Sequence, residues 1–255
     1  MAILCRARLQ TISRLRTRGP RHDEALALLT LLAAASTAPA TVWHYDIDDP
    51  NGSANAGDIS CVTTSFDDVS EVFSWEYTIT ESAVGFSDAF WLVVSDGPNP
   101  KGVQNQLAIL YGDLAANRVS AFQYNGANNQ NSFMNPGQFI ESFDGVLNVS
   151  TTATERTIGF SIDVTNINDY VPTPAPTGSE AWEGVRFDDQ LGIWFHPSAG
   201  STISYDANGE VDGYTFRRQG WYDTSNRTTT VVPAPAPLAL LGLALMAMLG
   251  LRRSR

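Results

Sequence analysis

The feature that most constrains the fold of this chain is a strict alternation of apolar and polar residues in two segments. In residues 71–80, an aromatic or aliphatic side chain stands at every odd position from Phe73 to Ile79. Residues 157–164 repeat the pattern at the even positions. Successive side chains of a strand point to opposite faces. A period of two therefore predicts β-strands with one buried face.

Turn-forming residues separate the short strand candidates. Asn125-Gly126 and Asn208-Gly209 are typical of hairpin turns, and proline and glycine interrupt residues 95–102. No segment between the two chain ends has a helical period over three turns. Many short strands between turns predict an all-β fold, as a single β-sandwich or jelly-roll-like domain over residues 41–231. The further strand candidates are residues 89–94, 106–111, 118–124, 191–195, 214–217 and 228–232.

Residues 1–40 have the organisation of a secretory signal peptide. An arginine-rich region precedes an apolar run over residues 25–35, and Ala38 and Ala40 form an A-x-A site. This arrangement predicts export and cleavage by signal peptidase after Ala40. The apolar run is too short for a membrane anchor, because a helix needs about 20 residues to span the bilayer.

Residues 232–255 combine a proline-rich motif, an apolar segment and a terminal arginine cluster. Proline prevents continuation of a helix and keeps the motif extended and accessible. The apolar composition of residues 238–251 predicts a hydrophobic transmembrane helix. The arginines that follow are expected to stay on the cytoplasmic side. The motif consists of Val232, Pro233, Ala234, Pro235 and Ala236, and the cluster consists of Arg252, Arg253 and Arg255.

This order of motif, helix and arginines resembles the PEP-CTERM sorting signal of Gram-negative bacteria. That signal usually begins Val-Pro-Glu-Pro, and Ala234 stands in the place of the glutamate, so the tail is similar to the Val-Pro-x-Pro-Ala variant. The resemblance implies processing by an exosortase, a transpeptidase-like membrane enzyme. It also implies transient anchoring in the inner membrane and delivery to the cell envelope, the cell surface or the extracellular matrix. A plain C-terminal membrane anchor is the alternative.

Two internal segments, residues 90–102 and 190–197, also resemble parts of exported PEP-CTERM proteins. That group has no assigned activity. The likeness therefore implies the exported location and the sandwich fold, and it implies no reaction or ligand.

The charge of the central segment excludes one class of partner. The formal net charge is −11, yet the two terminal segments hold nine of the 16 basic residues and only two of the 27 acidic ones. Residues 41–232 therefore contain seven basic and 25 acidic residues. Such a surface repels a phosphate backbone, so we expect no nucleic-acid partner. The same surface attracts divalent cations.

Cys61 is the single cysteine beyond the predicted leader, in which Cys5 lies. One thiol forms neither an internal disulfide nor a multi-cysteine zinc site. We therefore expect Cys61 to be a small buried residue, in a domain held by its core without a disulfide or an obligatory metal.

No set of residues predicts catalysis. A catalytic triad needs a nucleophile held by a histidine and a carboxylate, and no G-x-S-x-G elbow accompanies His44 or His196. We expect His196 to have a hydrogen-bonding role at a strand end. The adjacent acids at 67–68 and 188–189 would point to opposite faces of a strand, which does not suit glycoside hydrolysis. We predict that the domain is not an enzyme.

A weaker interpretation concerns calcium as a cofactor. The segment that begins at residue 46 is rich in oxygen ligands and reads as a loop, but Asn51 stands where the EF-hand spacing needs glycine. A string of Asx turns on the surface is the alternative, and we favour it. The candidate metal ligands are Asp46, Asp48, Asp49 and Asp58.

Sugar binding is the other interpretation that the residues leave open. Three aromatic residues in or beside predicted loops offer flat faces to a saccharide: Trp182, Trp221 and Tyr222. The tryptophans of the predicted strands, Trp75, Trp91 and Trp194, are expected in the core instead.

Two hypotheses from different classes follow. The first is a non-catalytic structural or adhesive protein of the cell surface or extracellular matrix, sorted by an exosortase-type system. The second is an extracellular carbohydrate-binding module, assisted by calcium, with polysaccharide as its partner. Loss of glycan binding on substitution of Trp221 separates them.

Overall fold

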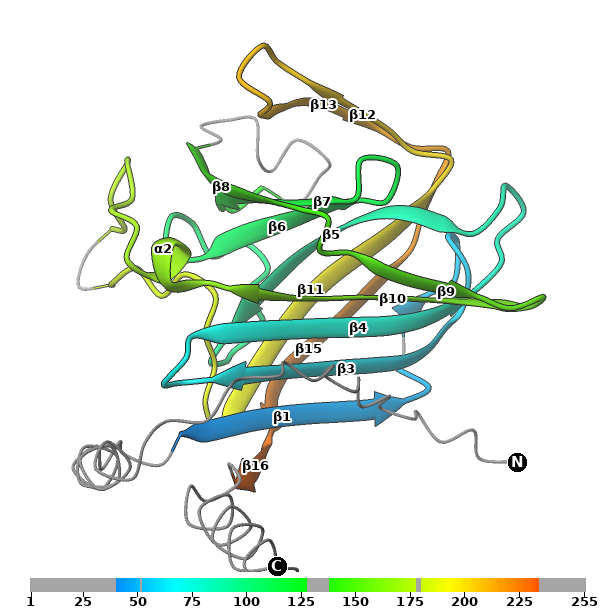
Figure 1. Ribbon diagram of the computed structural model, residues 1–255. Coiled ribbons are helices and arrows are strands. Elements are labelled where there is room, and N and C mark those ends of the chain that lie inside the picture. Colours follow the sequence, from blue (N-terminus) through cyan, green and yellow to red (C-terminus); the bar gives the residue numbers. More distant parts are fainter. Residues whose placement is uncertain (1–39, 51, 128–137, 178–179, 234–255) are drawn as a thin grey trace, which may run out of the picture. The chain divides into compact units, whose positions relative to one another are not determined.

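The computed structural model describes residues 40–50, 52–127, 138–177 and 180–233, and its strands confirm the all-β prediction (Figure 1). The predicted signal peptide, including Ala38, lies outside the described residues, apart from Ala40 at its end. So do the predicted transmembrane helix and Ala234, Pro235, Ala236, Arg252, Arg253 and Arg255. No helix in the described part of the chain has the length and apolarity needed to cross a membrane.

Six antiparallel strands form a first sheet, here named sheet A. They are β1 (Thr41–Asp48), β3 (Ile59–Asp67), β4 (Val72–Thr80), β9 (Asn148–Thr151), β10 (Glu155–Asp163) and β16 (Thr230–Pro233). Their order in the sheet is β16-β1-β3-β4-β10-β9. The two strands predicted from clean alternation, β4 and β10, are neighbours in its interior.

A second sheet, here named sheet B, is also antiparallel. Its strands are β2 (Gly52–Ser53), β5 (Ser87–Ser95), β6 (Ala108–Asp113), β7 (Arg118–Gln123), β8 (Gln138–Asp144), β11 (Gln190–Ala199), β14 (Arg218–Gln219) and β15 (Trp221–Thr228). The order is β2-β15-β11-β5-β6-β7-β8, and β14 pairs with the end of β11. A hairpin of β12 (Thr202–Tyr205) and β13 (Val211–Thr215) and a short helix α2 (Thr165–Asn168) complete the described elements.

The main core lies between sheets A and B, because the apolar faces of both sheets meet there. Phe195 of β11 contacts Trp75 and Tyr77 of β4, with ring centroids 5.0 and 4.7 Å apart. The Phe73–Ile79 face is buried throughout. The predicted inward face of residues 71–80 is therefore confirmed, and it packs against a second layer as a sandwich requires.

Sheet B also buries its opposite face. Trp91 of β5 and Trp194 of β11 lie there in a second cluster, with Tyr111 of β6 and Tyr214 of the β12–β13 hairpin. Burial on both faces explains why β5 and β6 have nearly continuous apolar sequences without alternation. It also confirms that Trp75, Trp91 and Trp194 are core residues, each no more than 2% exposed.

Two local predictions are wrong. Asp46 and Asp48 lie in strand β1, where a loop was expected, since Trp43, Tyr45 and Ile47 alternate with polar residues there. Asn125-Gly126 does not form a tight hairpin turn, because β7 ends at Gln123 and its partner β8 begins only at Gln138. Asn208-Gly209, in contrast, does connect the two strands of the β12–β13 hairpin.

Cys61 is buried, as expected, but it is not a lone thiol. It is disulfide-bonded, and its partner lies outside the described residues. The sequence argument assigned the second cysteine of the chain to the leader and so left Cys61 without a partner. The expectation of a domain without a disulfide is therefore wrong for this structure.

The start of the predicted sorting motif belongs to sheet A. Val232 and Pro233 end the edge strand β16, opposite Val42 and Thr41 of β1. The first residue after the predicted signal-peptide cleavage site and the second residue of the motif are thus register partners. The domain reaches two residues beyond the predicted boundary at residue 231.

The packing of β5 on β6 leads to a first prediction. A Cβ atom on Gly112 would lie 2.1 Å from the ring of its cross-strand partner Phe90. We expect Gly112→Ala to lower the free energy of unfolding by about 1–3 kcal/mol, because overpacking strains a filled core. In a Phe90→Leu background the same change should cost less. Urea unfolding of the unchanged protein, the two single variants and the double variant completes the double-mutant cycle. If Gly112→Ala lowers the free energy of unfolding equally in both backgrounds, the predicted contact is contradicted.

Candidate functional site

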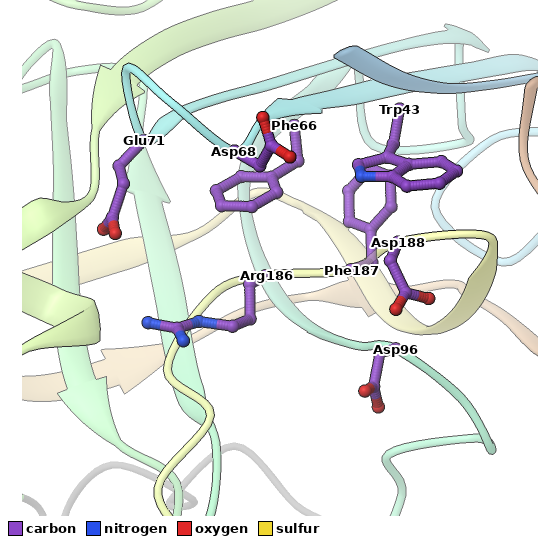
Figure 2. Close-up of a pocket in the computed structure, with 8 residues that line it drawn as sticks. All are labelled: Trp43, Phe66, Asp68, Glu71, Asp96, Arg186, Phe187 and Asp188. Atoms are coloured by element: carbon purple, nitrogen blue, oxygen red, sulfur yellow. The ribbon is translucent and has the colours of Figure 1, made fainter. Parts of the chain in front are cut away.

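A hollow of about 360 Å³ opens beside the first strands of sheet A (Figure 2). Three groups of residues line it. Trp43 comes from β1 and Phe66 from the end of β3, and the β3–β4 turn adds two acidic residues. The loop after β5 adds Asp96, and the segment before β11 adds residues 186–188. Segments far apart in the sequence therefore build this site.

The apolar part of the hollow consists of three aromatic rings. Phe66 and Phe187 are buried and contact each other, with ring centroids 6.1 Å apart and a tilted geometry. Trp43 is partly buried against the same core. Figure 2 shows the three rings grouped in the middle of the hollow, so this part of the surface is apolar.

Acidic side chains surround these rings, and hydrogen bonds from residues distant in the sequence hold two of them. Asp68 Oδ1 accepts a hydrogen bond of 2.9 Å from the backbone N–H of Thr41. Glu71 Oε2 accepts one of 3.0 Å from Asn168 Nδ2. Figure 2 shows Glu71 to the left of Phe66 and Asp96 below Trp43. The rim is therefore rich in hydrogen-bond acceptors.

Crowding of carboxylates changes the pKa values at this rim. Partial burial raises the pKa of Asp96, and the nearby charge of Asp188 raises it further. The side chain of Asp188 also raises the pKa of Asp189 through a hydrogen bond and through its charge. The expectation that adjacent acids point to opposite faces is wrong for this pair, because both residues lie in a bend before β11 and their carboxyl groups meet.

This arrangement suits a ligand that carries hydroxyl groups on an apolar ring. Carboxylates accept hydrogen bonds from hydroxyls, and aromatic rings pack against apolar faces. Arg186 adds a donor on the rim. A divalent cation is a second kind of ligand that carboxylate oxygens bind.

The predicted metal ligands do not gather at one place. Asp46, Asp48 and Cys61 bring one possible ligand atom each within 4.8 Å of one another on β1 and β3. Asp46 Oδ1 instead accepts a hydrogen bond of 3.2 Å from Thr63 Oγ1, and the disulfide-bonded Cys61 offers no thiolate. Within the described ranges, no close group of three includes Asp49 or Asp58.

The three predicted sugar-binding residues have different environments. The indole N–H of Trp182 donates a 2.8 Å hydrogen bond to the Ile167 carbonyl. Tyr222 is buried, and its hydroxyl lies 2.8 Å from that of Tyr45, so the expectation that it is exposed is wrong. Alternation explains this, because neighbours on β15 face opposite ways. Trp221 is 43% exposed, so it is the member of the set that a ligand reaches most freely.

His196 does not lie at a strand end, because β11 continues to Ala199. Its ring stacks on that of Trp91, with centroids 3.7 Å apart. The Gln219 side chain and the Gly220 backbone lie near enough to favour the charged ring, although no described residue meets full hydrogen-bond geometry with either ring nitrogen. Burial, with a contribution from Lys101, lowers the pKa of His196 to about 3. The ring is therefore neutral at physiological pH.

Comparison with known proteins assigns no relative: no protein-family model, curated protein or solved structure matches this chain. The functional argument therefore rests on the residues of the chain itself.

The raised pKa of Asp96 leads to a second prediction. A carboxyl group whose pKa is higher in the folded state contributes stability below its ordinary pKa of 3.8, and that contribution is lost as the pH rises through the folded value. Asp96→Asn should therefore raise the melting temperature at pH 7, by about 1–3 °C for a partly exposed group. At pH 3 the difference should disappear.

A matched control, Asp163→Asn, should change the melting temperature in the opposite direction. Hydrogen bonds from the Thr165 hydroxyl and backbone N–H lower the pKa of Asp163. Asp163→Asn should therefore lower the melting temperature at pH 7. Calorimetric melts at both pH values check the pair, and a shift in the same direction for both variants would contradict the assignment.

Proposed function

We propose that the chain is an exported protein of the cell surface or extracellular matrix, sorted by an exosortase-type system, with a non-catalytic structural or adhesive β domain. The observation that carries the proposal is the order of proline-rich motif, apolar segment and arginine cluster over residues 232–255. The signal peptide over residues 1–40 supports it independently, because a sorted chain must first be exported.

The tail is expected to stop the chain in the membrane during export. The apolar segment holds the chain in the membrane, and Arg252, Arg253 and Arg255 resist passage through the bilayer. The proline-rich motif then remains just outside the lipid, within reach of a membrane enzyme. Strand β16 ends at Pro233, so cleavage beyond it leaves the pairing of β16 with β1 intact.

The packing of the domain agrees with a non-catalytic role. The neutral His196 ring lies against Trp91, and a triad histidine needs a hydrogen-bonded nucleophile and carboxylate instead. The jelly-roll form of the sandwich is part of this proposal. It is supported by the chain path, which crosses from sheet A to sheet B after β1, β4 and β10 and returns to sheet A after β2, β8 and β15.

The third prediction tests the proposed export and sorting. In a host with an exosortase, the surface-displayed protein should begin at Thr41 and lack residues 238–255. Intact-mass measurement and N-terminal sequencing check both ends. Replacing Pro233 and Pro235 by alanine should leave anchoring intact and stop processing, whereas deleting the three arginines should let the chain slip through or misorient. If the mature protein retains residues 238–255, the tail is only a membrane anchor and the sorting proposal fails.

A second candidate function is an extracellular carbohydrate-binding module, assisted by calcium. The observation that favours it is the hollow of Figure 2, in which Trp43 and two phenylalanines are surrounded by carboxylates. Aromatic faces and acceptor groups are what a saccharide ring needs. The rim carboxylates are also oxygen ligands of the kind that calcium prefers.

The fourth prediction tests this candidate with a glycan array and the full-length chain, in calcium and in chelator. Trp43→Ala should weaken binding at this hollow by about tenfold, since aromatic anchors dominate binding energy. The control is Val149→Ala, an exposed apolar residue on β9 outside the hollow. An array without signal, or binding that Trp43→Ala leaves unchanged, counts against the hollow as the binding site.

A further inference from the structure

A second hollow, of about 210 Å³, lies on the face of sheet B that points away from sheet A. Two strands and one loop line it. Trp194 and His196 project from β11, and Trp221 and Asp223 project from the neighbouring strand β15. Lys101 comes from the loop that follows β5. We name this site the Trp221 hollow.

Strand pairing fixes the positions of these side chains. Trp194 is the register partner of Asp223, and the next pair along is Phe195 with Tyr222. Phe195 and Tyr222 point into the main core between the sheets. Because side chains alternate along a strand, their neighbours on both strands face the other way, into the Trp221 hollow.

His196 forms part of the wall of the hollow. Its side chain is 9% exposed, and its ring stacks on that of Trp91. Both ring nitrogens are shielded from solvent, and the Gln219 side chain and the Gly220 backbone lie near them. The ring therefore shapes the hollow, and the more exposed side chains are left to bond a ligand.

Lys101 and Asp223 supply the complementary groups. Lys101 is the single lysine of the chain, and its ammonium group makes no ion pair with any residue that the structure describes. It offers donors only, whereas the carboxylate of Asp223 offers acceptors only. These two side chains give the hollow donors and acceptors in one small space.

Trp221 provides the flat surface. It is 43% exposed at the mouth of the hollow, while Trp194 is buried in the wall. An exposed indole beside mixed donors and acceptors suits a ring with an apolar face and an edge of hydroxyl groups. The volume is below the range of about 300–1,000 Å³ typical of sites for drug-sized ligands, so it suits one ring.

We propose that the Trp221 hollow binds one pyranose residue of a neutral polysaccharide, with the sugar ring stacked on Trp221 and its hydroxyls hydrogen-bonded to Lys101 and Asp223. The inference shares its ligand class with the second candidate function, but it assigns a different site. It does not depend on the processing of the tail.

Charge selects a neutral sugar over an acidic one. The hollow holds one cationic and one anionic side chain, Lys101 and Asp223. The surrounding segment, residues 41–232, contains 25 acidic and only seven basic residues. The long-range field therefore opposes the approach of a polyanion.

The test uses calorimetric titration of the purified full-length chain with cellohexaose, laminarihexaose, mannohexaose and the acidic hexamannuronate. At least one neutral hexasaccharide should bind. Trp221→Ala should weaken that binding by about tenfold or more, because it removes the stacking surface. Lys101→Met and Asp223→Asn, two conservative changes, should each weaken it by about threefold or more. Near-ultraviolet circular dichroism confirms that each variant is folded.

Trp43→Ala is the matched control, because it removes a tryptophan from the hollow of Figure 2 instead. It should leave the affinity unchanged. Three results would overturn the inference: no binding of any neutral hexasaccharide, binding of hexamannuronate alone, or binding that folded Trp221→Ala retains. If Trp43→Ala abolishes binding and Trp221→Ala does not, the second candidate function survives and this inference fails.

Discussion

The contact of Phe195 with Trp75 and Tyr77 joins the two sheets, and the Trp221 hollow depends on it. Phe90 of β5 packs on the same ring, with centroids 6.1 Å apart. Once these inner faces are fixed against each other, the outer faces of β5 and β11 are fixed as well. Trp91, Trp194 and His196 face outward because their strand neighbours are held in the core. The site beneath Trp221 is thus a consequence of packing between the sheets.

The two hollows differ in electrostatics as a result of how each is built. Loops and turns supply the carboxylates of the hollow of Figure 2, and they bring several of them together. Partial burial raises the pKa of Asp96, and the charge of Asp188 raises it further. Two paired strands and one loop line the Trp221 hollow, and its single lysine is balanced by a single aspartate. The first hollow therefore suits cations and hydroxyls, and the second suits an uncharged polar ring.

The proposed sorting signals and the candidate ligand-binding sites lie in separate parts of this chain. Residues 1–40 and 232–255 carry the proposed export and sorting signals, whereas the described residues that line the two hollows all belong to the domain between them. The domain itself contains the core and the two hollows. The one link is the edge pair Thr41 and Pro233, which brings both ends of the proposed mature domain onto neighbouring strands.

The sequence by itself determined the fold class, the inward face of β4 and β10 and the core position of three tryptophans, because alternation and aromatic content are local properties. The alternation of apolar and polar residues in β1 is also visible in the sequence, although Asp46 and Asp48 had suggested a loop. Which polar residues meet depends on the tertiary structure. Strand register brings His196 of β11 and Asp223 of β15 to one face, and the fold of the loop after β5 adds Lys101. The burial of Tyr222 beside the exposed Trp221 depends on that same register, since a shift of one residue would exchange their faces.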